Sequence, residues 1–262
     1  MKNTFMFFVV LLLVTVNHFQ VVANDHSTLV DKVYIKSGLA EQIPAYQEQV
    51  NIMMKAYESQ LSEKMMAVFV EELNKVFSPI IFEARIKQYL KSDLDAETLS
   101  HILKWCESAL GKRVVEVEVM SSSAEETRKF IEFSQQADLS KVPQNRLDLL
   151  NRLDNATEST ETTTDAGIYF GATIAEVWND MNPETKPYSR NQILQFIKGQ
   201  RTQMLEVTRE RILLTFLYTY RELTDEDLLK YVEFTEMTMT KKFNKAVSKA
   251  ILRSVYIKSD LT

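Results

Sequence analysis

The sequence predicts an all-α protein, a multi-helix bundle built from two tandem, internally duplicated helical units. Its 262 residues include only five glycines and five prolines, fewer turn residues than a sheet architecture normally needs. Apolar residues recur at helical spacing along much of the chain. The 21-residue segment "LDAETLSHILKWCESALGKRV" from Leu94 matches "LTDEDLLKYVEFTEMTMTKKF" from Leu223 in its polar opening, apolar stripe and basic end.

Residues 1–23 are expected to be a cleaved signal peptide. Lys2 precedes an uncharged apolar run from Phe5 to Val16, and Ala23 supplies the small residue that signal peptidase needs. This run is shorter than the roughly 20 residues that span a bilayer. We therefore expect a periplasmic or secreted chain with no transmembrane segment after cleavage, and an uncleaved anchor is the alternative.

Residues 28–154 are predicted as unit 1 and residues 155–262 as unit 2, packed together as one domain. The two quoted segments align without a gap at a shift of 129 residues, which places Asp95 and Thr224 at helix N-caps. Each cap has a hydrophobic staple, formed by Leu94 with Leu99 and by Leu223 with Leu228.

A second similarity lies upstream, where "LVDKVYIKSGLAEQ" from Leu29 resembles "LLNRLDNATESTET" from Leu149 at a shift of 120 residues. Neither unit buries its apolar stripe alone, so we expect the two stripes to pack on each other. Trp105 and Phe234 occupy equivalent positions and are expected to widen this contact.

Periodicity and cap signals place the individual helices along the chain. Ser78 before Pro79 predicts a capped start, and Ser189 with Gln192 predicts a capping box. Residues 114–120 alternate as a strand does, but the equivalent residues of unit 2 are helical in pattern, so helix is preferred. Residues 155–165 are either an exposed linker or the frayed start of a helix. The expected helices lie near 28–37, 42–60, 63–77, 79–91, 96–120, 124–137, 143–153, 160–181, 190–221 and 225–256.

The residues that carry chemistry in other proteins form no motif in this chain. The formal net charge of −5 becomes more negative by one when Lys2 is removed, which argues against nucleic acid as a partner. A single Cys106 allows no internal disulfide and is expected to be a buried small hydrophobe. Glu116 with Glu118 and the acids of 225–227 are expected to be solvated surface. We predict no catalytic residue, no metal site and no cofactor.

Two weaker features suggest interactions. Lys241, Lys245, Lys249 and Arg253 recur every four residues, and we call them the basic ridge. The helix macrodipole stabilises cations near a helix C-terminus. The ridge also suits an anionic surface or an acidic partner. The aromatic and methionine content fits either a buried interface or an apolar cavity between helices.

The stretch from Leu223 resembles a family of exported bacterial proteins of unknown function. The family pattern is Leu-Thr-x-x-Glu-Leu, an aromatic segment and a Gly-Lys-Lys end; here Leu223, Thr224, Leu228, Phe234 and Lys241-Lys242 match it. Unit 1 keeps Gly111-Lys112-Arg113 at the basic end, and "RLDLLNRLDNATES" from Arg146 is also similar to such chains. The resemblance implies an all-helical, periplasmic or secreted protein without an assigned activity.

Three functional hypotheses follow. The first is a non-catalytic module that binds an unknown protein or an anionic envelope surface through the basic ridge. The alternative is a carrier of an apolar small molecule or lipid between the two units. The third is a hydrolase that acts on envelope polymers through carboxylates, whose sites have no spacing signature.

Overall fold

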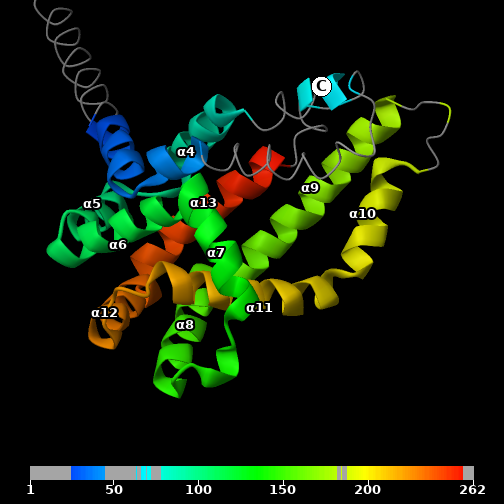
Figure 1. Ribbon diagram of the computed structural model, residues 1–262. Helices are drawn as coiled ribbons and strands as arrows, with labels where there is room; N and C mark the ends of the chain where they lie inside the picture. Colours follow the sequence, from blue (N-terminus) through cyan, green and yellow to red (C-terminus); the bar gives the residue numbers. More distant parts are fainter. Residues whose placement is uncertain are drawn as a thin grey trace, which may run out of the picture.

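The computed structural model describes residues 25–44, 78–181 and 188–255, with isolated positions between 63 and 71 and residue 184. Every regular element within these ranges is a helix, which confirms the all-α class (Figure 1). The predicted signal peptide, most of the helix at 42–60 and most of the helix at 63–77 lie outside the described residues.

The helices follow one another with short connections. Two helical segments, 25–36 and 39–44, come first. The next helices are α4 Pro79–Asp93, α5 Ala96–Cys106, α6 Ala109–Ser121, α7 Ala124–Gln136, the 3-10 turn η1 Leu139–Lys141 and α8 Gln144–Thr157. The last helices are α9 Ser159–Met181, α10 Arg190–Gly199, α11 Arg201–Thr219, α12 Asp225–Glu236 and α13 Thr238–Val255.

The predicted helix starts are largely confirmed. The Asp95 carboxylate accepts from the Thr98 amide at 2.7 Å, and the Thr224 hydroxyl accepts from the Asp227 amide at 3.2 Å. Ser189 forms its capping box, whereas the Ser78 side chain makes no capping hydrogen bond before α4. The four staple leucines are at most 5% exposed, so each cap is held by buried apolar contact.

Three helices predicted as continuous are broken, at Glu107-Ser108, at Gln200 and at Met237. The Ser108 hydroxyl accepts from the Gly111 amide and donates to the Trp105 carbonyl. A Cβ at Gly111 would lie 1.9 Å from that carbonyl oxygen, so only glycine allows this turn. Residues 114–120 are helical within α6, as preferred, and residues 155–165 are neither a linker nor a frayed end because α8 and α9 run through them.

Two geometric agreements support the duplication, which stays a prediction. Ser108 and Met237, the residues that precede α6 and α13, are 129 positions apart. Gly38 and Glu158, with φ of 78° and 53°, are the described residues in the left-handed region and are 120 positions apart. Both separations equal the shifts at which the sequence aligns with itself.

Helix α13 runs through the middle of the molecule and contacts α4, α5, α8, α9 and α12 (Figure 1). One hydrophobic core joins helices of both predicted units; its fully buried members include Val33, Leu99, Leu150, Leu228 and Ala250. A smaller cluster of Ile168, Ala172 and Leu194 joins α9 to α10 at the outer side. The predicted unit boundary at residue 154 lies within α8.

Arg146 of α8 holds the turn between α11 and α12. Its buried guanidinium donates to the carbonyl oxygens of Tyr220 at 2.6 Å and Leu223 at 2.9 Å, and to the Asp225 carboxylate at 2.8 Å. Both carbonyls lie in the turn that follows α11, and that of Tyr220 also accepts from the Leu223 amide at 2.9 Å. The guanidinium therefore ties α8 to this turn by hydrogen bonds to three of its acceptors.

We expect Arg146→Ala to lower the free energy of unfolding by about 3 kcal/mol, because it removes a buried charged donor from the carbonyls of Leu223 and Tyr220 and from the Asp225 carboxylate. Urea denaturation followed by circular dichroism measures this loss. Arg209→Ala, at an exposed position of α11, is the matched control and should stay within about 0.5 kcal/mol of the wild type. Equal effects of the two changes would contradict this role of Arg146.

Candidate functional site: an aromatic cavity between the predicted units

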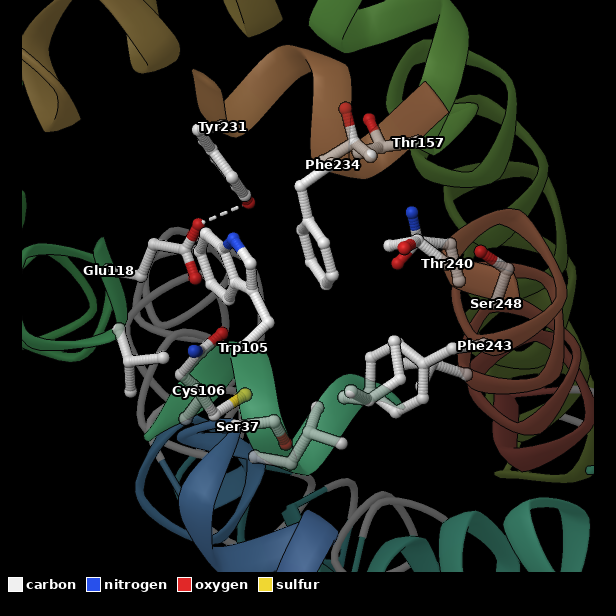
Figure 2. A pocket seen from close by; sticks show the side chains of 17 residues that line it. Ser37, Trp105, Cys106, Glu118, Thr157, Tyr231, Phe234, Thr240, Phe243 and Ser248 are labelled. Atoms are coloured by element: carbon white, nitrogen blue, oxygen red, sulfur yellow. Dashed lines mark hydrogen bonds between the residues drawn. The ribbon is translucent and has the colours of Figure 1, made fainter. Parts of the chain in front are cut away.

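A cavity of about 210 Å³, open to solvent on one side, lies where α5, α6, α12 and α13 meet (Figure 2). Both predicted units line it. Unit 1 contributes Ser37, Leu39, Gln42, Ile102, Trp105, Cys106, Val115 and Glu118. Unit 2 contributes Thr157, Tyr231, Phe234, Thr235, Thr240, Phe243, Asn244, Val247 and Ser248.

Stacked aromatic rings form one wall of the cavity. Trp105 and Phe234 stack in parallel with ring centroids 4.2 Å apart and an interplanar angle of 7°, and Trp105 also stacks on Tyr231 at 5.3 Å. The expected contact between equivalent residues of the two units is therefore present. A contact between equivalent positions is what a two-fold relation between units produces.

Cys106 lies beside this wall as a buried thiol. Burial raises the pKa of Cys106 to about 12, with a smaller contribution from the Glu118 charge. The thiol is therefore protonated at neutral pH. A nucleophilic cysteine needs the deprotonated form, the thiolate. This agrees with the expectation of a small buried hydrophobe.

Glu118 of α6 is the carboxylic acid among the residues that line the cavity. Its Oε1 accepts hydrogen bonds from the hydroxyls of Tyr220 and Tyr231, each at 2.7 Å (Figure 2 shows the second). Burial raises the pKa of Glu118, and the two phenol hydrogen bonds oppose this in part. The expectation that Glu118 is solvated surface is wrong, whereas Glu116 is exposed as expected.

Two polar atoms at the cavity have no hydrogen-bond partner. Thr240 Oγ1 and Asn244 Nδ2 are both buried and unpaired, and both residues line the cavity from α13. Leaving a buried donor or acceptor unpaired costs about 1–3 kcal/mol. Such groups mark a site where a missing molecule would complete the hydrogen bonding.

A second glutamate–tyrosine pair shows how neighbouring cations change the pKa of the glutamate. Glu126 of α7 accepts from the Tyr218 hydroxyl at 2.7 Å and forms ion pairs with Lys129 and Arg221. The hydrogen bond from Lys129 contributes most to lowering the pKa of Glu126 to about 2. The pair ties α7 to α11, outside the cavity.

The structure places the basic ridge on the exposed side of α13, and all four side chains are solvent-exposed. The Lys249 ammonium pairs with Asp93 at 2.8 Å and lies 5.0 Å from the centre of the Tyr89 ring. A groove of about 510 Å³ lies between three residues of the ridge and acidic groups at the N-terminal end of α9, one of which directly precedes the helix. The charged lining comprises Lys245, Lys249, Arg253, Glu158, Glu161 and Asp165. The ridge therefore lies beside acidic side chains, which reduces its positive field.

The sequence predicted a buried contact at Trp105 and Phe234 but not the polar groups of the cavity. Glu118 follows the fully buried Val114 by four residues, so it lies on the buried face once residues 114–120 are read as helix. That signal was available in the sequence. Thr240 and Asn244 gave no such signal, because only tertiary packing leaves their polar atoms without partners.

Two absences hold for the described part of the chain. No three His, Cys, Asp or Glu side chains there gather closely enough to bind a metal ion. None of its helices is both long and apolar enough to cross a membrane. Comparisons with protein-family models, with curated proteins and with solved structures found no match, so the resemblance to exported bacterial proteins stays a prediction.

The pH dependence of stability tests the environment of Glu118. Its raised pKa means that the folded chain holds the proton more tightly than the unfolded chain. This stabilisation is full below the ordinary pKa of 4.5 and is lost as pH rises through the folded-state value. We expect the free energy of unfolding of Glu118→Gln, which cannot ionise, to fall less than that of the wild type as pH rises above 4.5. Urea titrations across this range measure it, and identical slopes would contradict the assignment.

Glu126 is expected to show the opposite sign. Its pKa of about 2 means that its stabilising contribution is present above the ordinary value of 4.5 and is lost as pH falls towards 2. Glu126→Gln should therefore flatten the acid limb of the stability profile and leave the neutral limb unchanged. A variant that changes the neutral limb instead would show that the two glutamates have been assigned to the wrong environments.

Proposed function

We propose that this chain is a non-catalytic carrier that binds one small, largely apolar molecule in the cavity between the two predicted units. One observation carries the proposal: an aromatic cavity of about 210 Å³ contains two buried polar atoms without partners. Cavities that stay empty have apolar linings, so a molecule able to form hydrogen bonds is expected to occupy this one.

The cavity's size limits the ligand. Cavities of about 150 Å³ bind benzene, and drug-sized ligands occupy about 300–1,000 Å³. At about 210 Å³, the cavity suits a single ring with a few attached atoms. A full-length lipid chain exceeds it, so the proposal keeps the small-molecule half of the carrier hypothesis.

Native mass spectrometry of protein purified from its own host tests the proposal directly, together with binding of ethylbenzene to the ligand-free protein. The chain contains two tryptophans, Trp105 in the cavity wall and the partly exposed Trp178. In a Trp178→Phe background, the fluorescence of Trp105 reports binding. A bound small mass or saturable quenching supports a carrier, whereas a ligand-free mass without quenching rejects it.

Val247→Phe is expected to fill the cavity from α13. Val247 is partly buried and lines the cavity, so a larger side chain there occupies the space of the ligand. We expect ethylbenzene affinity to fall at least about tenfold, equivalent to about 1.4 kcal/mol, while thermal unfolding changes little. Val207→Phe, at a position 66% exposed, is the control and should leave affinity unchanged. Unchanged binding by Val247→Phe would place the ligand elsewhere.

The basic ridge supports a second candidate, binding to an anionic surface, because all four of its side chains are exposed. Lys249 is already paired with Asp93, so the test changes Lys241 and Lys245. We expect their joint replacement by Gln to weaken co-sedimentation with anionic vesicles about 30-fold, at about 1 kcal/mol per lysine. The control is a double variant at two exposed positions of residues 25–36, Lys32→Gln with Lys36→Gln. Equal losses of vesicle binding in the two double variants would reject the ridge as the binding surface.

The envelope-polymer hydrolase has less support. Most glycosidases place two carboxylic acids about 5–9.5 Å apart across the scissile bond. The residues that line the aromatic cavity include Glu118 as their one acid, and it is engaged by two tyrosines. This cavity therefore does not assemble such a pair.

A further inference from the structure

The two unpartnered groups of α13 define which small molecule the cavity recognises. Building on the proposed function, we propose that the ligand is an uncharged single-ring compound bearing an oxygen that accepts hydrogen bonds, a ring ketone or a comparable carbonyl compound. Thr240 and Asn244 bind that oxygen, and the aromatic side chains bind the ring.

Thr240 and Asn244 act from one helix face. They are four residues apart in α13, so their side chains are neighbours one turn apart. Thr240 is only 2% exposed, and its Oγ1 has no partner among the described residues. Asn244 Nδ2 is unpartnered as well. Two adjacent groups that both lack partners point to one shared partner.

The chemistry of the pair selects an acceptor. The Asn244 amide nitrogen donates, and the Thr240 hydroxyl can donate with it. A carbonyl oxygen has two lone pairs and therefore accepts from both groups at once. A hydrocarbon has no lone pair, so it would leave both groups without a hydrogen-bond partner.

The lining of the cavity disfavours an anionic ligand. Figure 2 shows Glu118 and Thr240 on opposite sides, with the Phe234 ring between them. The residues that line the cavity include no Lys, Arg or His, so a carboxylate ligand would lose its hydration there without gaining a compensating positive charge. The oxygen at the α13 side must therefore belong to a neutral group.

Three probes of similar size separate these possibilities: acetophenone, ethylbenzene and benzoate. Quenching of Trp105 fluorescence in the Trp178→Phe background gives their affinities. We expect acetophenone to bind at least about tenfold more tightly than ethylbenzene, although transfer from water by itself favours the hydrocarbon. Benzoate is expected to bind most weakly of the three at neutral pH.

The variants assign the preference to the two residues. Thr240→Val and Asn244→Leu keep the approximate side-chain volume and remove the polar atoms, so each should reduce the preference for acetophenone severalfold and leave ethylbenzene affinity equal or tighter. Thr240→Ser retains the hydroxyl and should retain the preference. Thermal unfolding followed by circular dichroism checks that each variant is folded, and the serine variant keeps the test decisive if the valine variant does not fold.

The outcomes distinguish this inference from the function on which it rests. If none of the probes binds, the carrier itself is rejected. If ethylbenzene and acetophenone bind equally, the carrier stands and this inference is overturned, because water satisfies the two groups. A preference that survives in both Thr240→Val and Asn244→Leu, or a benzoate affinity equal to that of acetophenone, also overturns it.

Discussion

The parallel stack of Trp105 on Phe234 is the contact on which the arrangement of the two predicted units depends. The rings lie 4.2 Å apart at the C-terminal ends of α5 and α12. Each helix ends within two residues of its ring, at Cys106 and at Glu236. The chain then starts α6 and α13 after a sharp turn, so four helices surround the stack. Residues of these four helices line the cavity.

Polar contacts between distant segments complement this apolar contact. The Glu118 carboxylate joins α6 to Tyr220 and Tyr231, and Arg146 joins α8 to the turn before α12. Glu118 and Glu126 both accept from tyrosine, yet burial raises the pKa of one and a neighbouring lysine lowers the pKa of the other. The same side-chain pairing therefore stabilises the fold over different pH ranges, according to the cations nearby.

Local sequence signals predicted where the helices start but did not predict where they break. Asp95 and Thr224 were recognisable as caps because capping depends on residues within one turn. The break before α6 depends on the fit of Gly111 against the Trp105 carbonyl, which a helical pattern does not reveal. Likewise the contact of Trp105 with Phe234 followed from the repeat, whereas the unpaired state of Thr240 arises only from long-range packing.

A double-mutant cycle on Trp105 and Phe234 tests the central claim most directly. Free energies of unfolding are measured for Trp105→Ala, Phe234→Ala, the double variant and the wild type. Aromatic pairs contribute about 0.5–1.5 kcal/mol beyond their buried area, so we predict a coupling energy in that range. Additive effects, with a coupling indistinguishable from zero, would show that the two rings do not interact and would contradict the arrangement of both units around them.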